Sequence, residues 1–483
     1  MNFASYRRRL QLSPESWVTL QLLYTQVFGV AVFAILAPLL PPRAFGLVAI
    51  VMVFVTFCEA TLDSATEALI SIEAIEPPHY STVNAVAFLG GTAFAAVLEI
   101  AASPLAAWFK EPQLEPVVRV MAILPLLSGL SAAPSAATKR IVAFRPLALR
   151  MICGVTAGGA VGLALAILDK GVWALVAQAI VQRGVSTLIL WSASPLSFRI
   201  KLSPRHWRDI AAFGRPLAVS KSLSWASSQL PRFVLAMHLS LTDLGLFSLA
   251  TRLTDIVTSL TVVPKTAVAR VELRQFGLHS PDLIRATSQL MSGLGVLCFL
   301  LCCFGAALLP QLIHAWLRPQ WFGLVLPGQL LLLGTASSVT FYAATALFLA
   351  TRQQRIEAWV SIFQVVTIVL ATAAFGARGL TATAAALAIR SCLLVAPVSM
   401  LIKKCCGVPY ESFLGSQALP LAVAALVALP VGLTARFAEP RIGPTPALIG
   451  CGTAGLLLYG LVLRAAWRVQ PSARPGWTLR ARN

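Results

Sequence analysis

Long apolar runs separated by short polar stretches recur along the whole chain. Most runs reach about 18 residues or more, which lets a helix cross roughly 30 Å of hydrocarbon. The ten-residue alternation of apolar and polar positions that marks a transmembrane β-barrel is absent. The pattern predicts fourteen helical spans, at about 17–40, 45–70, 81–108, 116–137, 149–168, 171–193, 212–238, 243–264, 286–312, 322–349, 356–375, 379–402, 417–435 and 445–464.

Composition supports the same class of protein. Of 483 residues, 58% are hydrophobic and 12% are charged, whereas soluble domains carry about 25% charged residues. We therefore expect an all-α polytopic membrane protein. Nine cysteines lie mostly inside apolar runs without metal-ligand spacing, so neither a metal site nor a disulfide framework is predicted. The basic N-terminal stretch lacks a small-residue cleavage site, and we expect it to lead into a retained first helix.

The net charge of +20 is concentrated in the gaps between apolar runs. Cytoplasmic loops of membrane proteins retain Lys and Arg in this way, so membrane topology accounts for the charge and nucleic-acid binding is not expected. An N-terminus on the cytoplasmic side puts most of the basic loops inside, among them "TKRIVAFRPLALR" and "FRIKLSPRHWRD". The asymmetry predicts an even number of spans with both termini in the cytoplasm.

Two short sequence echoes indicate an internal repeat of six helices. Gly46 opens the second predicted span and Gly245 the eighth, and in both a charged residue and a bulky apolar one lead into Gly-Leu. "ATKR" ends the fourth span and "ATRQQR" ends the tenth. Repeats of the same orientation are related by an axis along the membrane normal and hold the substrate between them near the midplane. We therefore predict two pseudo-symmetric six-helix bundles around a central cavity, plus two C-terminal helices. The expected segments are a first bundle at 1–193, a basic linker at 194–211, a second bundle at 212–405, and two extra helices with a basic tail at 406–483.

Five cationic side chains fall inside predicted spans and away from their ends, where burial of a charge is costly and usually reflects function. They are Arg183, Lys221, Arg232, Arg252 and Arg390. Lys221 and Arg232 are eleven residues apart, about three helical turns, so they share a face with Ser224 and Ser228 between them. Arg183 follows Gly171, and Arg390 follows Gly379, at nearly equal spacing, which places the two arginines at similar depths in the two bundles. Because a guanidinium binds phosphate oxygens with two donors, a cationic cavity would suit an anionic ligand.

Acidic side chains also fall inside the spans. Glu59, Asp63 and Glu67 are spaced at i, i+4 and i+8 and form one slanted face of the second span. Asp255 lies one turn after Arg252 in the eighth span. We interpret these four carboxyl groups as candidates for proton or sodium coupling, or for ion pairs that gate the conformational change.

Structural explanations for the same residues remain open at this point. Arg252 and Asp255 could neutralise each other, and Lys221 could extend to the cytoplasmic interface. The acids of the second span could pair with Arg183 as fixed links between helices. Arg232 and Arg390 lie nearer the middle of their spans, where we favour positions in a cavity.

Two stretches carry a resemblance to a known family. They are "FKEPQLEPVVRVMAILPLLSGLSAAPSAATKRIVAFRPLALR" followed by "GVWALVAQAIVQRGVSTLILWSAS", and "FGRPLAVSKSLSWASSQLPRFVLAMHLSLTDLGLFSLATRL". The chain resembles, over about residues 14–405, the polysaccharide and O-antigen flippase family of the multidrug/oligosaccharidyl-lipid/polysaccharide exporter superfamily. Members often place an aspartate before the arginine of the seventh helix, where this chain has Pro231.

The resemblance implies a transporter, not an enzyme, that flips polyprenyl-pyrophosphate-linked oligosaccharide or exports polysaccharide across the bacterial inner membrane by alternating access. It implies no catalytic residues and no cofactor beyond a coupling proton or sodium ion. Its implied partners are membrane lipid, the lipid-linked oligosaccharide, a polysaccharide polymerase and chain-length machinery. In this reading Arg183, Arg232, Arg252 and Arg390 bind the anionic head group, and Lys221 lies near the inner entrance.

Two other functions stay open. A cation-coupled multidrug extruder of the same superfamily would share the fold and use the acids of the second span. A membrane polysaccharide polymerase or ligase would be an enzyme, although such enzymes keep sizeable external loops and the external connections here are short. No G-x-x-x-x-G-K-[ST] signature occurs in the sequence, so ATP hydrolysis by the chain itself is not predicted.

Overall fold

Helices make up almost all of the chain that the computed structural model describes, which is residues 14–72, 75–141, 144–194, 196 and 201–469. No strand occurs in this described part, and the predicted all-α class is confirmed. In chain order the elements are α2 (Pro14–Leu39), α3 (Pro42–Ser71), α4 (Pro77–Trp108), α5 (Leu114–Met121), α6 (Ile123–Arg140), α7 (Phe144–Ile167), α8 (Val172–Ala193), α9 (Pro204–Ala236), α10 (Leu241–Leu273), α11 (Pro281–Trp316), the 3₁₀ helix η1 (Pro319–Leu324), α12 (Val325–Ala350), α13 (Gln354–Gly376), α14 (Leu380–Leu393), α15 (Val395–Cys406), α16 (Tyr410–Ile442) and α17 (Pro444–Val469).

Proline and glycine set several of these boundaries. Proline is the first residue of α3, α4, α9 and α11. At this position an N–H would have no acceptor within the helix, so its absence in proline costs no hydrogen bond. Gly171 and Gly379 precede α8 and α14 with φ of 57° and 98°, a left-handed region that favours glycine. These two turns occupy equivalent places in the predicted six-helix repeat.

The predicted spans fall on described helices, and thirteen of those helices are long and apolar enough to cross a membrane. The chain is therefore a multi-pass membrane protein. The exception is α9, which has 33 residues but does not count among the apolar spans. Charged residues and a run of serines lower its hydropathy; the charged residues are Arg205, Arg208, Asp209, Arg215, Lys221 and Arg232.

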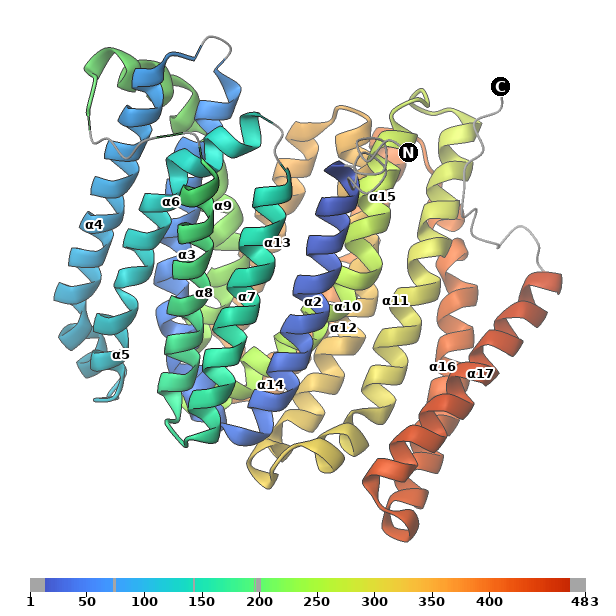
Figure 1. The fold of residues 1–483 in the computed structure, drawn as a ribbon. Coiled ribbons are helices and arrows are strands. Elements are labelled where there is room, and N and C mark those ends of the chain that lie inside the picture. Colours follow the sequence, from blue (N-terminus) through green and yellow to red (C-terminus); the bar gives the residue numbers. More distant parts are fainter. Residues whose placement is uncertain (1–13, 73–74, 142–143, 195, 197–200, 470–483) are drawn as a thin grey trace, which may run out of the picture. The chain divides into compact units, whose positions relative to one another are not determined.

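The chain divides into two compact units, Met1–Met237 and His238–Asn483. Within the first unit α6 packs on α3 and α4, and α7 packs on α8 (Figure 1). Within the second unit α12 packs on α10 and α11, and α13 packs on α14. The same three pairings thus recur six spans later. The polar helix α9 packs on α3 of the first unit, and the predicted division into six-helix bundles stays a prediction.

Small residues bring α7 and α8 close together. A Cβ atom added at Gly154 would lie 2.8 Å from the carbonyl oxygen of Gln182, and one added at Gly158 would lie 2.6 Å from that of Gln178. Such distances are too short for a side chain, so glycine permits the backbone approach that membrane helices use in place of hydrophobic association. This contact fixes the position of Arg183, which follows Gln182 on α8.

Arg140, the last residue of α6, fixes the end of α3. Its Nη1 atom donates to the carbonyl oxygens of Leu69, Ile70 and Ile72 at 3.3, 3.2 and 2.5 Å. These carbonyls belong to the last turn of α3, which has no intrahelical donors left to satisfy them. The cap ties α6 to the acidic helix α3.

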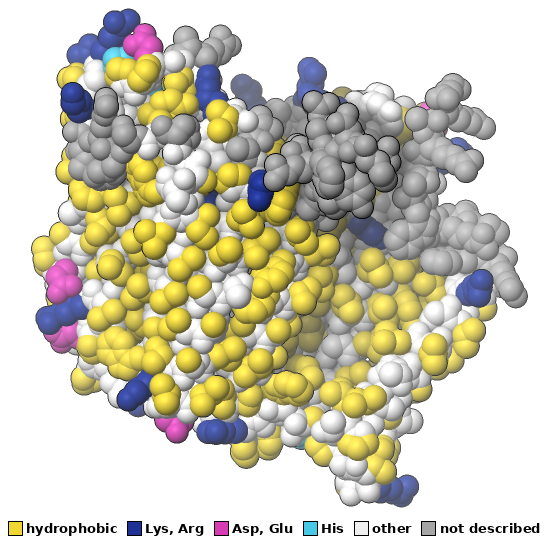
Figure 2. Space-filling model, in the orientation of Figure 1, with side chains coloured by type: hydrophobic (Ala, Val, Ile, Leu, Met, Phe, Trp, Pro, Cys, Tyr) yellow, Lys and Arg dark blue, Asp and Glu magenta, His cyan; other side chains and the backbone are white. Residues whose placement is uncertain are grey.

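Figure 2 shows hydrophobic side chains covering the middle of the helices of the first unit, with charged side chains gathered towards the helix ends. Several of these surface side chains are large and exposed, including Ile100 at 78% and Leu188 at 70%. In water such a surface would drive aggregation, whereas in a bilayer it faces the lipid chains.

Candidate functional site

The acidic row of α3 lies on one face of that helix, as its spacing predicts. Glu59, Asp63 and Glu67 are one turn apart, and their side chains are 24%, 41% and 36% exposed. Each carboxylate lies against a cation contributed by another helix of the first unit. The row therefore forms one side of a charged site in which the opposite charges come from α6, α8 and α9.

Lys221 of α9 bridges two of these acids. Its Nζ atom lies 3.1 Å from Oδ2 of Asp63 and 2.7 Å from Oε1 of Glu67. Lys139 of α6 approaches the other carboxylate oxygen of Asp63, at 3.9 Å. Lys221 is thus held between two carboxylates. The bridge ties α9 to α3.

Arg183 of α8 forms an ion pair with Glu59 through its Nη2 atom. The same carboxylate oxygen of Glu59 accepts a hydrogen bond from Ser128 of α6 at 3.2 Å. Trp225 of α9 packs beside this ion pair on α3. Its ring N–H donates to the Val53 carbonyl, and its ring lies edge-on to that of Phe57 with 4.8 Å between the ring centroids. Of the two interpretations left open for the acidic row, an ion pair with Arg183 occurs at Glu59, and a role of the row in coupling or gating stays a prediction.

These side chains surround a cavity of about 490 Å³ inside the first unit. Four cationic side chains and two carboxylates line it, and the Glu67 carboxylate pairs with Lys221 from outside the lining, which leaves an excess of one positive charge. The remaining lining is largely hydroxyl and amide groups. The charged lining residues are Glu59, Asp63, Lys139, Arg150, Arg183 and Lys221, and the polar ones include Thr56, Thr66, Ser128, Ser131, Ser135 and Gln229. A cavity of this kind can bind an anion bearing hydroxyl groups.

A side cavity of about 160 Å³ adjoins the main one and shares Glu59, Arg150 and Arg183 with it. Arg150 was not among the sequence-predicted site residues, because it was assigned to the basic loop after the fourth span. It lies seven residues into α7, which begins at Phe144. The available signal was an arginine within an apolar segment, the criterion that selected Arg183.

Other predicted site residues do not join this cavity. Arg232, also on α9, is half-buried and its Nη1 atom donates to Gln229 at 3.4 Å. Arg252 and Asp255 lie on α10 of the second unit, half-buried and exposed respectively. The side chains of Ser224 and Ser228, on the face shared by Lys221 and Arg232, lie outside the described residues.

Arg390 of α14 binds the neighbouring helix α13. Its Nε atom donates to Oγ1 of Thr367 at 2.9 Å, and its Nη2 atom donates to the carbonyl of Gln364 at 2.8 Å. The hollow beside it, about 600 Å³, is lined mainly by alanine, leucine, isoleucine and phenylalanine. Of the predicted site residues, the structure therefore gathers Glu59, Asp63, Glu67, Arg183 and Lys221 in one place. No group of three or more His, Cys, Asp or Glu in the described part of the chain is arranged to hold a metal ion.

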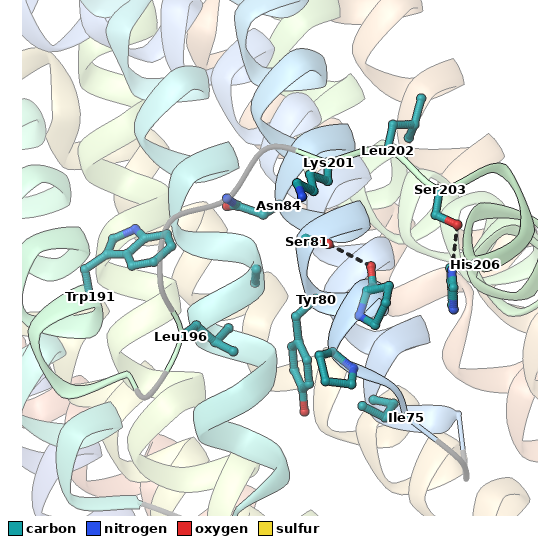
Figure 3. Close-up of a pocket in the computed structure, with 13 residues that line it drawn as sticks. Ile75, Tyr80, Ser81, Asn84, Trp191, Leu196, Lys201, Leu202, Ser203 and His206 are labelled. Carbon is teal, nitrogen blue, oxygen red and sulfur yellow. Dashed lines mark hydrogen bonds between the residues drawn. The ribbon is translucent and has the colours of Figure 1, made fainter.

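A third cavity in the first unit, about 780 Å³, is lined by residues of α4, α6 and α8 and by residues at the start of α9 (Figure 3). Tyr80 and Trp191 extend towards it from α4 and α8, and Lys201 reaches it from the connection between α8 and α9. Ala133 of α6 lines this cavity, whereas Ser131 and Ser135 line the charged one. At 100° per residue these positions lie on opposite sides of α6, so the helix separates the two cavities.

Hydrogen bonds pin the start of α9 to the start of α4. Ser203 and His206 are joined at 2.6 Å, as Figure 3 shows, and Nε2 of His206 lies 3.0 Å from Oε2 of Glu76. Nδ1 of His79 accepts from the Glu76 N–H at 3.1 Å, and its ring lies edge-on to that of His206 at 4.5 Å. The hydrogen bond from His206 lowers the pKa of the Glu76 carboxyl below its ordinary value of 4.5.

We expect the link between Glu76 and His206 to make a pH-dependent contribution to stability. Because the folded-state pKa of Glu76 is lowered, the stabilisation is complete above the unfolded-state pKa and disappears as the pH falls through the folded-state value. Thermal unfolding of purified protein in detergent should show a lower midpoint for Glu76→Gln than for wild type at pH 7. At pH values below the folded-state pKa of Glu76, where the carboxyl group is protonated in both states, the two midpoints should coincide. A difference that is constant across the pH range would contradict this assignment.

Comparison with known sequences identifies one family and one relative. A profile of the family described as "Polysaccharide biosynthesis protein" matches residues 35–326. The succinoglycan biosynthesis transport protein ExoT of Rhizobium meliloti (strain 1021) is 28% identical over 262 residues, which cover 53% of this chain and 52% of that protein. The chain thus aligns with about half the length of this relative.

Comparison with solved structures identifies a shared fold. A structure of the lipid II flippase MurJ in an inward closed conformation matches with a TM-score of 0.74 at 12% identity, covering 93% of this chain and 98% of that one. An inward-facing multidrug resistance MATE family transporter of the MOP superfamily matches with a TM-score of 0.57 at 12% identity, covering 78% and 95%. At these identities the likeness is one of fold.

Proposed function

We propose that this chain, which belongs to the polysaccharide biosynthesis protein family, moves a lipid-linked oligosaccharide across the membrane by alternating access. The observation that carries the proposal is the cavity of about 490 Å³, in which four cationic side chains oppose two carboxylates. Polar side chains inside a membrane protein normally face a water-filled path or a partner. An excess of positive charge on such a path favours a phosphorylated head group.

The lining fits the two parts of such a substrate. Guanidinium and ammonium groups bind phosphate oxygens through charge-assisted hydrogen bonds. The serine, threonine and glutamine side chains offer both donors and acceptors, which match sugar hydroxyl groups. The lipid tail would remain in the bilayer, since burying each of its methylene groups in hydrocarbon is favourable by about 0.8 kcal/mol.

The comparisons support the same proposal. The relative of known role is named as a transport protein of succinoglycan biosynthesis, and the MurJ structure is titled as that of a lipid II flippase. The proposal makes the chain a transporter and not a polysaccharide polymerase or ligase. It also includes a place in the bacterial inner membrane with both termini in the cytoplasm, and a polysaccharide polymerase with chain-length machinery acting on the transported units.

Coupling is part of the proposal at the acidic row of α3. Lys221 occupies the space between Asp63 and Glu67 in which a sodium ion or a proton would bind if the lysine moved away. Exchange of the lysine for a proton or a sodium ion would then release α9 from α3. Transport into liposomes under imposed proton or sodium gradients distinguishes the two ions.

A multidrug extruder is the second candidate, favoured by the fold shared with a MATE family transporter and by the acidic row. Organic cations require carboxylates free to receive them. Glu59 already faces Arg183, and Asp63 and Glu67 already face Lys221. We therefore favour the anionic substrate. Efflux of a cationic dye that rises on expression of the chain would support the extruder instead.

Deletion of the gene tests the proposal directly. We expect the deletion strain to accumulate lipid-linked sugar intermediates on the cytoplasmic side and to lose the exported polysaccharide. Expression of the wild-type chain should restore both to the parental level. The matched control is a deletion strain that expresses the chain with a stop codon early in α3. Normal polysaccharide without accumulated intermediates in the deletion strain would refute lipid-linked transport.

A further inference from the structure

The side cavity of about 160 Å³ in the first unit has a lining distinct from that of the main cavity. Arg150, Gln182, Arg183 and Ser186 supply its donors, and Met52, Leu124 and Met151 are among its apolar walls. We propose that this side cavity is a phosphate subsite in which Arg150 and Arg183 bind a phosphoryl group of the transported head group. The inference rests on the proposed function and adds a site and a residue, Arg150, to it.

Arg150 supplies the first argument, because one of its donors is buried without an acceptor. Its Nε atom is inaccessible to solvent, and no hydrogen-bond partner for it occurs among the described residues. A buried donor that stays unsatisfied costs about 1–3 kcal/mol, and more when it carries charge. Native proteins leave few such groups. Because the atom is inaccessible to solvent in this structure, an oxygen in the side cavity would reach it only after the guanidinium group turns towards the cavity that Arg150 lines.

The charge balance supplies the second argument. Two guanidinium groups and one carboxylate, Glu59, line the side cavity. Glu59 is already engaged by Arg183 and by the hydroxyl of Ser128, so its charge is compensated before a ligand enters. The second guanidinium, that of Arg150, is the excess charge. Apolar walls lower the local dielectric constant and strengthen its attraction for an anion.

Size supplies the third argument. The side cavity has about a third of the volume of the main one, from about 160 and 490 Å³. It can hold a phosphoryl group with some water, since one water needs only about 10–15 Å³ of such space, but it leaves little room for an oligosaccharide. The two cavities share Arg150, Arg183 and Glu59. A head group can therefore place its phosphate in the side cavity and its sugars in the main one.

The neighbouring helices hold the subsite rigid. Gly154 lines the side cavity, and the close approach of α7 to α8 at this glycine sets the separation of Arg150 and Arg183. The helices that carry the two arginines are therefore held together by backbone contact and not by flexible loops, an arrangement that lowers the entropy cost of binding.

Calorimetric titration of the full-length chain in nanodiscs tests the proposal with two probes, inorganic pyrophosphate and farnesyl pyrophosphate. We expect Arg150→Gln to weaken the binding of both about tenfold to a hundredfold, the range for a hydrogen bond to a charged group. The matched control is Arg145→Gln, five residues earlier on α7, where the side chain is exposed; its affinities should equal those of wild type. Arg150→Lys, which keeps the charge and loses the Nε donor, should give an intermediate affinity.

The outcomes separate the subsite from the proposed function. Unchanged affinity of Arg150→Gln for both probes, in protein that unfolds at the wild-type temperature, overturns the subsite. If Arg150→Gln does not fold, equal affinities of Arg150→Lys and wild type overturn it. Binding of inorganic pyrophosphate alone overturns the assignment to a lipid-borne phosphate. If the deletion strain accumulates no lipid-linked intermediate while the binding results hold, the proposed function fails and the subsite stands.

Discussion

Replacement of Arg183 by glutamine is expected to lower transport at least about tenfold, because the loss of a charge-assisted hydrogen bond costs about 1.5–3 kcal/mol. Arg183 is 34% exposed and its partner Glu59 is 24% exposed. The variant leaves that partly buried carboxylate without its cation and removes one of the four cationic groups of the main cavity. Restoration of polysaccharide export in the deletion strain measures the effect. Arg119→Gln is the control, since Arg119 is 49% exposed beside Glu99 and Glu115 and exposed pairs contribute little.

A charge swap separates binding from a purely structural link. In the double variant Glu59→Arg with Arg183→Glu, the ion pair between α3 and α8 is rebuilt with its polarity reversed. We expect thermal unfolding to return towards the wild-type midpoint while transport stays low, since the cation no longer lies where the side cavity needs it. Transport recovered by the swap would show that the pair serves only to join the helices, and that Arg183 does not contact the substrate.

Replacement of Gly129 by alanine is expected to be the most destabilising single-methyl change in the first unit. A Cβ atom at Gly129 of α6 would lie 2.2 Å from the carbonyl oxygen of Ala87 of α4. Backbone cannot yield as a flexible side chain can, so the two helices must separate. Overpacking of this kind costs about 1–3 kcal/mol, and sometimes more. The melting temperature in detergent and the amount of folded protein in the membrane should both fall.

The matched control for this prediction is Gly184→Ala on α8. A Cβ atom at Gly184 would meet nothing within 4 Å, and alanine is favoured over glycine inside a helix by about 1 kcal/mol. The same substitution should therefore raise the melting temperature at Gly184 and lower it at Gly129. Equal effects at the two positions would mean that α4 and α6 do not approach as closely as the contact at Gly129 requires.

The membrane class, the helical spans and the acidic row were predictable because each depends on local sequence. An apolar run of sufficient length in hydrocarbon must satisfy its own backbone hydrogen bonds and so becomes a helix. The i, i+4 and i+8 spacing of Glu59, Asp63 and Glu67 puts them on one face of any helix. The polar helix α9 was also predicted as a span, on length and neighbours, although its hydropathy alone does not identify it.

The partners of these residues were not predictable to the same degree, because charge spacing within one helix does not reveal which helix packs against it. The sequence left Lys221 either near the inner entrance of a cavity or at the membrane interface, and its contact with Asp63 and Glu67 depends on α9 lying against α3. Arg390 carried the same sequence signal as Arg183, yet its donors bind α13. Arg150, the second residue of the predicted span 149–168, was counted with the basic loop before it, whereas α7 begins six residues earlier, at Phe144.

The sequence by itself determined that this chain crosses a membrane many times and carries an acidic face on its second span, since hydrophobic length and helical period are properties of single segments. The tertiary structure alone decided which cations meet those acids, and where two cavities open between the helices. The physical reason is that close approach depends on glycines such as Gly129 and Gly154 meeting a particular backbone on another helix. Only that pairing fixes the distances over which charges attract.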